Sequence, residues 1–362
     1  MSLKIIRGKT LPIGLDVGSS TVKMAQLRCA DGEVELLAAE SAPLAPACRT
    51  DRAKRLNELT RVIRRILKGG AFKNRRCVLS LPADETFVQH LKLPKSEPAE
   101  VNLTIRRELA GKLAYPVEEA IVRHIVAGEV QGEGGARQET IVVATRRVRL
   151  EAYVAAARRA KLDVAGVNVA SCAIVECFAR LFRRTSDASR TILYVDVGAA
   201  TTQVVLSHGQ RIVFARDLAI GGDQLDQVVA EGLGIPLDDA HTMRVKAMQG
   251  PLDEVIEAEL ERLLAAPLRR LTDELTQCLR YYESVFRGRG IERVIFLGGQ
   301  AYDKRLCQWV AQRLNLPAQV GDPLVRVRRG EGVSITALNH RQPQPGWAVA
   351  VGLSLGASHQ AA

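Results

Sequence analysis

The chain has 362 residues, of which 47% are hydrophobic and 4% are aromatic. This length can form two domains, each with its own core, and no apolar run of about eighteen residues predicts a transmembrane helix. The start of the sequence lacks the apolar core and the cleavage site of a secretory signal. The seven cysteines are scattered without a CxxC pair, so neither a disulfide framework nor a zinc site is indicated. We therefore expect a cytoplasmic protein.

Positive charge is in excess, with 51 lysines and arginines against 40 acids and a formal net charge of +11. Arginine-rich clusters lie at 61–76, 145–149, 179–184 and 325–330. Such clusters attract nucleic acid or anionic lipid, but they also occur as solvated helix faces and loops. Because few aromatic side chains are available to stack on bases, we favour the second interpretation and do not expect nucleic acid as a partner.

The start of the chain has the pattern of strands with one helix among them. Apolar residues alternate with small or acidic ones over 11–17, as in a buried strand, and an apolar pattern resumes over 22–27. Next come a predicted strand at 34–44, an amphipathic helix at 51–70 that ends in two glycines, and a short buried strand at 77–82. This order predicts an α/β layer.

A smaller α+β unit interrupts that layer. Strands are predicted over 86–94, 120–130 and 138–147, and helices over 98–116 and 149–162. The unit lies between the first layer and a second run of α/β pattern. We interpret it as an insertion.

The opening pattern then recurs. A short strand and a long apolar helix are predicted over 164–184, and "LYVDVGAATTQVVLS" follows. This segment superposes on "IGLDVGSSTVKMAQL", with Asp16 over Asp196 and Gly18 over Gly198. An internal repeat of this kind predicts two related halves.

The repeated segments have the chemistry of a phosphate site. An acid at the carboxyl end of a buried strand faces the crevice where open α/β sheets bind ligands. A small-residue turn after it lets backbone N–H groups approach a phosphate. Asp16 and Asp196 would hold Mg²⁺ through water, because that ion dehydrates reluctantly. For either segment alone, the alternative is a tight hairpin with an acid that stabilises its turn.

A third segment, at 291–323, reads as a strand, a Gly298-Gly299 turn, an amphipathic helix and a second strand. This is the layout of a loop that packs against adenosine. Before it, 253–286 has long helical periodicity, and Pro267 predicts a kink or a new helix start there.

Together these segments resemble the two phosphate motifs and the adenosine motif of the actin, sugar kinase and heat-shock chaperone superfamily. The insertion is like that of FtsA and PilM, and "LPADETFVQHLKLP", "ARDLAIGGDQLDQVVAEGLGIPLDDA" and "WAVAVGLSLGA" look like the corresponding PilM stretches. The resemblance covers nearly the whole chain and is most specific over 190–244. The expected fold class is therefore α/β: an actin-like (ribonuclease H-like) two-domain fold with an FtsA/PilM-type inserted subdomain.

Resemblance to the PilM-type type IV pilus assembly family implies a cytoplasmic ATP-binding scaffold peripheral to the inner membrane. The implied partner is the cytoplasmic N-terminal peptide of a PilN-like inner-membrane protein. Pilus alignment-complex proteins and self-association are further expectations. By resemblance, the peptide groove lies between the first subdomain and the inserted one, with 86–94 and the turn "LAYPVEEA" at 113–120 as candidate walls.

The resemblance also implies four subdomains. The first half would comprise 1–85 and 161–189, with the insertion at 86–160. The second half would comprise 190–222 and 290–362, and its accessory lobe at 223–289 would be helical.

The resemblance implies ATP and Mg²⁺ as cofactors, with Asp16 and Asp196 at the metal. The residues expected to bind nucleotide are Gly18, Ser19, Ser20, Lys23, Gly198, Thr201, Thr202, Gly222, Arg244, Gly298 and Gly299. Lys23 could equally be an outward-facing strand lysine, and the two threonines could be β-branched residues that begin a strand.

The sequence departs from the family pattern at several places. Gln300 follows the glycine pair, where we expect a third small residue; it would crowd the nucleotide or hydrogen-bond to it. His241 and Arg244 replace an acid and a lysine. Further along, Asn168 stands where relatives often carry Asp, and Ala170 and Ser171 stand where hydrolytic relatives can offer an acid.

Glu176 is one candidate for that missing acid, with a packed helix side chain as the alternative. We therefore assign no catalytic residue and expect at most slow ATP hydrolysis.

Two other functions fit parts of the sequence. A small-molecule kinase of the same superfamily would need a general-base Asp beside an acceptor pocket, and we find no clear unassigned strand-end Asp. A basic protein that binds nucleic acid or lipid would use the arginine clusters and would bind nucleic acid with steep salt dependence.

Overall fold

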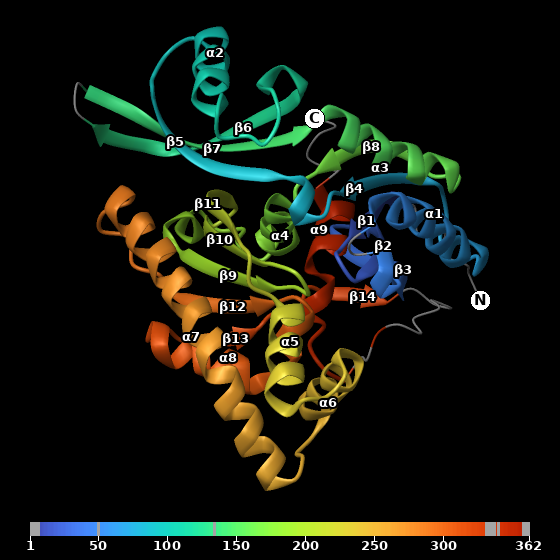
Figure 1. Cartoon of the computed structure of the whole chain (residues 1–362). Coiled ribbons are helices and arrows are strands. Elements are labelled where there is room, and N and C mark those ends of the chain that lie inside the picture. The colour runs from blue at the N-terminus through green and yellow to red at the C-terminus, as the bar shows by residue number, and fades with distance from the viewer. Residues whose placement is uncertain (1–7, 49–50, 133–134, 330–337, 339–340, 357–362) are drawn as a thin grey trace.

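The computed structural model describes residues 8–48, 51–132, 135–329, 338 and 341–356 (Figure 1). Predictions that concern 1–7, 49–50, 133–134, 330–337, 339–340 and 357–362 lie outside these residues. The first part of the chain forms the elements β1 (Lys9–Val17), β2 (Thr21–Ala30), β3 (Glu33–Pro43), α1 (Arg52–Lys68) and β4 (Arg76–Ser80). They match the α/β layer predicted for this part.

The inserted unit and its surroundings comprise β5 (Phe87–Pro94), α2 (Pro98–Leu109), β6 (Ala120–Gly132), β7 (Gly135–Arg146), α3 (Arg147–Arg159), β8 (Asp163–Asn168) and α4 (Ala170–Ala179). The helix predicted over 98–116 is shorter than expected, because Ala110 has an extended ψ of 125°. The helix predicted to reach residue 184 also ends early, at Ala179.

The remainder comprises β9 (Thr191–Val197), β10 (Thr202–His208), β11 (Arg211–Leu218), α5 (Gly222–Leu233), α6 (Leu237–Gln249), α7 (Glu254–Val285), β12 (Arg293–Leu297), α8 (Lys304–Leu314), β13 (Ala318–Val320), β14 (Val327–Arg329) and α9 (Ala348–Gly356). No new helix starts at Pro267, because α7 continues through it (Figure 1).

The two main sheets share one topology. The first has the order β14-β3-β2-β1-β4-β8 and the second β11-β10-β9-β12-β13. In each, the strand that carries the repeated acid pairs antiparallel with the next strand and parallel with a later one. The predicted relation between the halves is therefore present in the strand order as well as in the sequence.

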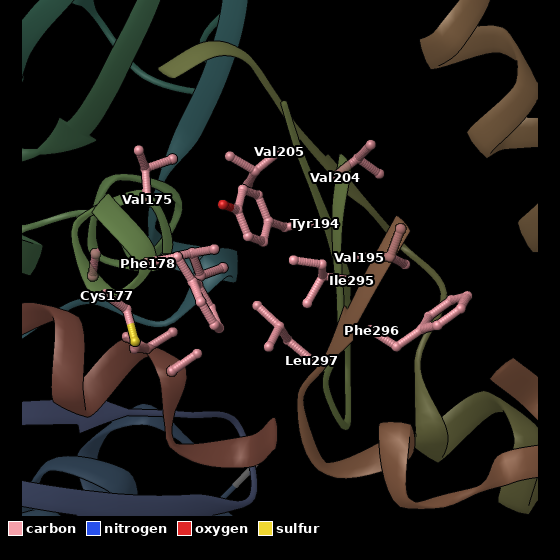
Figure 2. Packing of buried hydrophobic residues seen from close by; sticks show 14 of the residues in the cluster. Val175, Cys177, Phe178, Tyr194, Val195, Val204, Val205, Ile295, Phe296 and Leu297 are labelled. Atoms are coloured by element: carbon pink, nitrogen blue, oxygen red, sulfur yellow. The ribbon is translucent and has the colours of Figure 1, made fainter. Parts of the chain in front are cut away.

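Two helices lie between these sheets. The helix α9 packs on β1, β2 and β4 of the first sheet, α4 packs on β10 and β11 of the second, and the two helices pack on each other. Figure 2 shows Phe178 of α4 directed toward Tyr194 and Leu297 of the second sheet. The Phe178 and Tyr194 rings stack with centroids 5.3 Å apart.

Glycines permit this close approach. A Cβ at Gly352 of α9 would lie 1.8 Å from the carbonyl oxygen of Ala173 on α4. A Cβ at Gly14 of β1 would lie 1.9 Å from the carbonyl oxygen of Ala350. Both neighbours are backbone atoms, which cannot move aside as a side chain would.

The inserted sheet, of order β5-β7-β6, contacts both halves. One face packs under α2 around Ile105 and Val142, and the other joins the main core through Ala127 and Ile141 beside β11. The helix α3, which lies inside the predicted 86–160 limits, buries Tyr153, Ala156 and Ala157 in the core of the first half. The subdomain limits themselves remain a prediction.

The α4–α9 contact gives a direct stability test. Gly352→Ala should lower the free energy of unfolding by about 3 kcal/mol, because the added methyl group meets backbone on the facing helix. Urea denaturation followed by circular dichroism measures the change. Gly250→Ala is the matched control, since a Cβ there meets nothing within 4 Å, and its effect should stay within about 0.5 kcal/mol. Equal effects of the two substitutions would show that the contact is not close.

Candidate functional site

A cleft between the two halves collects most of the predicted site residues. Its lining includes Asp16, Gly18, Ser19, Ser20, Lys23, Asp196, Gly198, Thr201, Gly298 and Gly299. Three predicted residues, Thr202, Gly222 and Arg244, are not part of that lining. The ten that are come from three segments far apart in the sequence, as the motif pattern predicted.

The two small-residue turns have the same construction and face each other. The Gly18 N–H donates to the Thr21 carbonyl at 3.0 Å, and the Gly198 N–H donates to the Thr201 carbonyl at 2.9 Å. Across the cleft, the Ala200 N–H donates to Ser19 Oγ at 3.2 Å. A polyphosphate placed here would therefore meet backbone of both halves.

The paired acids line the cleft and are partly buried. Asp16 lies opposite Lys23 in the β1–β2 register, and its Oδ1 accepts a hydrogen bond from Ser80 Oγ at 3.2 Å. Burial raises the pKa of Asp16, although the Lys23 charge and the Ser80 bond oppose the rise. Burial, reinforced by the negative charge of Asp16, raises the pKa of Asp196 to about 7.

This donor set fits Mg²⁺. The ion is commonly bound by one or two carboxylates together with substrate phosphates, and it keeps several waters. Burial raises the pKa values of these two partly buried carboxylates because little positive charge lies nearby to oppose it, and a cation would supply that charge. Among the described residues, no cluster of three or more His, Cys, Asp or Glu forms a metal cage, so phosphate or water would complete the coordination.

Gly298 brings the third motif against the second acid. A Cβ at this position would lie 2.3 Å from Asp196 Oδ1, and its φ of 85° favours glycine. The Gly298-Gly299 turn therefore lies directly against Asp196, one of the two candidate metal ligands. A larger residue at Gly298 would displace either the turn or the carboxylate.

Two polar residues beside Asp196 were missed by the sequence analysis. Gln203 pairs with Asp196 across β9 and β10 and lines the cleft, and its buried Oε1 has no hydrogen-bond partner. Asp217 lies opposite Gln203 on β11, and burial raises its pKa to about 6. Our expectation of no clear unassigned strand-end acid therefore overlooked Asp217. The alternation of side chains along the strand after Thr201 could have indicated that Gln203 lies on the same side as the site. The position of Asp217 could not be predicted, because it depends on the register of the β10–β11 hairpin.

The Arg244 side chain is directed into the protein, where it hydrogen-bonds to other residues. Its guanidinium is buried and donates to the Gly222 carbonyl at 3.0 Å, to Asp226 Oδ1 at 2.6 Å and to Gln300 Oε1 at 2.6 Å. Asp226 also lies 2.7 Å from His241 Nδ1 through its other oxygen. The contacts join α5, α6 and the turn after β12. Gln300 thus hydrogen-bonds to Arg244, and a purine on this turn would compete with that bond.

The remaining site candidates have structural contacts. The Thr202 hydroxyl is buried and donates to the Ile220 carbonyl at 2.7 Å, which ties β10 to the segment before α5. Asn168 Oδ1 accepts from the Val169 N–H at 2.8 Å. Ala170 lines the cleft, whereas Ser171 is buried in α4 and Glu176 packs beside Gly356. The described part of α4 therefore places no acid in the cleft.

The wall of the cleft continues into the inserted unit. Residues 81–84 line the cleft and are followed by Glu85 and β5. Arg55 donates to the Gly18 carbonyl at 3.3 Å and to Asp84 Oδ2 at 3.2 Å. These bonds connect the first phosphate turn to the segment that enters the insertion.

Buried Glu85 anchors the joint itself. Its carboxylate accepts from Arg52 Nε at 2.8 Å and from Arg149 Nη1 at 3.1 Å, and its carbonyl accepts from the Thr145 hydroxyl at 2.8 Å. The partners come from α1, α3 and β7. The insertion is therefore attached to the first half by a charged network next to the cleft.

Comparison with known proteins identifies the family. The sequence model of the family described as type IV pilus assembly protein PilM matches residues 14–358. The chain belongs to the PilM family. No helix in the described ranges is both long and apolar enough to cross a membrane.

Solved structures confirm the predicted fold class. A chain of the PilM-PilN type IV pilus biogenesis complex matches with a TM-score of 0.78 at 21% identity, covering 96% of this chain and 98% of that chain. The ethanolamine utilization protein EutJ from Carboxydothermus hydrogenoformans matches with a TM-score of 0.53 at 13% identity, covering 96% of this chain and 89% of that chain. This chain therefore has the actin-like α/β fold of the PilM family over nearly its whole length.

The raised pKa of Asp196 predicts a pH-dependent stability in the absence of ligand. Because the pKa of Asp196 is raised to about 7, its contribution to stability is present below about pH 4 and is lost as the pH rises through 7. Asp196→Asn should remove this loss and raise the free energy of unfolding at pH 8, relative to wild type, by on the order of 2 kcal/mol.

Urea unfolding of both proteins at about pH 4.5 and about pH 8 measures the effect, because these two pH values lie on either side of the pKa of Asp196. Mg²⁺ should stabilise wild type at pH 8 and leave Asp196→Asn nearly unchanged. A variant that is less stable than wild type at both pH values would contradict the interpretation of Asp196 as a desolvated charge.

Proposed function

We propose that this PilM-family chain is an ATP- and Mg²⁺-binding scaffold at the cytoplasmic face of the inner membrane. It docks the cytoplasmic N-terminal peptide of a PilN-like inner-membrane protein in type IV pilus assembly. The observation that carries the nucleotide part is the pair of acid-and-turn units that meet across the cleft. Pilus alignment-complex proteins and further copies of the chain are proposed as additional partners.

Each part of the cleft has a proposed role toward the nucleotide. Asp16 and Asp196 would hold Mg²⁺, which supplies charge neutralisation for the phosphates. Backbone N–H groups of the two turns and the Lys23 ammonium would bind phosphate oxygens. The Gly298-Gly299 turn would lie against adenosine. The Arg244–Gln300 bond closes the neighbouring side, so base binding would require that bond to open or to shift.

Slow hydrolysis at most is consistent with the side chains present. The cleft wall includes the amide side chain of Gln203, whose Oε1 is buried, and α4 contributes no acid to it. A neutral amide can orient water but cannot take its proton at neutral pH. We therefore propose that nucleotide occupancy, rather than rapid turnover, is the working state of the scaffold.

The kinase alternative rests on Asp217. This acid lies two strands from Asp196, but it is not part of the cleft lining. A general base has to reach the acceptor hydroxyl within hydrogen-bond distance. The scaffold proposal is favoured, and the absence of a phosphorylated small molecule after incubation with ATP would support it.

The partner peptide is proposed to dock where the inserted unit meets the first half. The strand β5 pairs with β7 on one side and has no strand on its other side among the described residues, so this edge can accept an extended chain. Pro94 ends it, since proline cannot donate to a ladder. Tyr115 in the turn at 113–120 lies under the Arg146 guanidinium, 5.8 Å from the ring centroid, at the start of α3.

Nucleotide binding is predicted to depend on the second acid. Asp196→Ala should weaken Mg-ATP binding by about 1.5–3 kcal/mol, roughly tenfold to hundredfold, because a charge-assisted metal contact is lost. Isothermal calorimetry with and without Mg²⁺ measures it. Asp238→Ala, an exposed acid at the start of α6, should bind as wild type. Wild-type affinity in Asp196→Ala would refute the metal role.

The docking site is tested by crosslinking. With p-benzoylphenylalanine in place of Tyr115, illumination should attach the partner's synthetic N-terminal peptide, because that turn is a proposed groove wall. The same crosslinker in place of Leu237, an exposed apolar residue on α6, should not capture it. Mass spectrometry of the adducts reads the result. Capture at position 237 alone would move the site to the second half, against the proposal.

A further inference from the structure

One end of the first half carries a dense group of exposed cations, which we name the basic end. Residues 64–76 and 158–163 form it, and together they contain nine lysines and arginines and one acid, Asp163. The last turn of α1, the connection to β4 and the first residue of β4 contribute exposed cations: Arg65, Lys68, Lys73, Arg75 and Arg76. Among the described residues, none of these five forms an ion pair within 4 Å.

The end of α3 completes the same surface. Arg158, Arg159 and Lys161 are exposed there, and α3 packs beside α1. Arg64 Nη2 donates to the Arg159 carbonyl at 2.7 Å, and the Asp163 N–H donates to the Arg75 carbonyl at 2.8 Å. These bonds place the two groups of cations next to each other, so their charges act on one region of solvent.

Folding explains only part of this charge. Basic residues in the last turn of a helix gain about 0.3–1 kcal/mol each from the helix dipole, which accounts for Arg65, Lys68 and the pair at the end of α3. Lys73, Arg75, Arg76 and Lys161 lie outside helices and gain nothing of this kind. Their mutual repulsion lowers stability, and an anionic partner would offset it.

The basic end is separate from the proposed nucleotide cleft. Arg76 and Asp163 begin the parallel strands β4 and β8, whereas Ser80, which bonds to Asp16, ends β4. The cations thus lie at the amino ends of these strands and the cleft at their carboxyl ends. A nucleotide in the cleft cannot be the anion that this surface meets.

The chemistry of the surface favours lipid headgroups over nucleic acid. The aromatic residue within these segments, Phe72, is buried in the core, so it gives bases no platform for stacking. A polybasic surface near anionic lipid gains about 1 kcal/mol per Lys or Arg without any inserted apolar group. We propose that the basic end binds the anionic phospholipid surface of the membrane. The proposal rests on the proposed function in one respect: a membrane-anchored partner holds the chain within range of that surface.

Vesicle flotation of the full chain, without partner peptide, tests this proposal. Wild type should float with phosphatidylglycerol-containing vesicles, should remain behind with pure phosphatidylcholine, and should dissociate as salt is raised. The variant Lys68→Glu/Lys73→Glu/Arg158→Glu should bind at least tenfold more weakly. None of these three side chains makes an ion pair or hydrogen bond in the described residues, and an unchanged unfolding transition would verify the fold.

The control makes the same change in net charge elsewhere. Arg269→Glu/Arg270→Glu/Arg280→Glu alters exposed cations of α7 in the second half and should float like wild type. Equal loss in both triple variants would mean that net charge alone acts, and equal binding by the first variant and wild type would exclude the basic end. Competition by duplex DNA or RNA at lower phosphate concentration than vesicles would assign the surface to nucleic acid and overturn the proposal. Because the flotation assay contains no peptide, a negative result would not affect the peptide-docking proposal. A negative crosslinking result would likewise not affect the lipid proposal.

Discussion

The close packing of α4 on α9 is the contact on which the two-part architecture depends. In chain order α4 follows β8 of the first sheet, yet it packs on the second sheet. The helix α9 follows β14, packs on the first sheet and contacts α4. This pair of helices therefore joins the cores of the two sheets. Gly14 and Gly352 permit the short distances, since a methyl group at either would meet backbone. Because α9 packs on the strand that carries Asp16 and α4 packs on the sheet that carries Asp196, the cleft between these acids is positioned by the same packing.

That positioning has an electrostatic cost. The packing shields both carboxylates from part of the solvent, and their mutual repulsion adds to the burial that raises the pKa of Asp196. A protein selected for stability alone would have amides or apolar residues at these two strand ends. Acids that are buried without sufficient positive charge nearby are typical of a ligand site, where the bound cation contributes the missing interaction. Lys23 supplies part of it, and the remaining deficit is the physical reason to expect affinity for Mg²⁺ and phosphate.

Local patterns predicted the fold class and most residues that the structure brings together in the cleft, but they did not reveal contacts between distant segments. Asp16, Gly18 and their repeats Asp196 and Gly198 could be predicted because a strand followed by a tight turn is encoded within a few residues. The role of Arg244 could not, since it depends on how α6 packs against the turn after β12. In the same way the Thr202 hydroxyl binds a carbonyl of another segment, and Asp217 approaches the site only through the register of the β10–β11 hairpin. The end of α2 at Leu109 was also missed, although Gly111, with a φ of 81°, stands just beyond it.

The inserted unit is placed to respond to both halves at once. Glu85 joins it to the first half beside the cleft wall, while buried Glu139 accepts from the Tyr281 hydroxyl of α7 at 2.7 Å and lies 2.7 Å from His90 Nδ1. The other ring nitrogen of His90 lies 3.2 Å from the Ala215 carbonyl oxygen on β11. Rotation of one half against the other would have to break or exchange contacts in one of these two networks, because each network fixes the insertion to a different half. Loss of a partner there would be costly, since a buried polar group without a hydrogen bond is destabilising. A nucleotide that draws the two phosphate turns together would therefore act on the insertion through bonds already present. The basic end, at the opposite end of the first sheet, lies outside both networks and can bind a surface without closing the cleft.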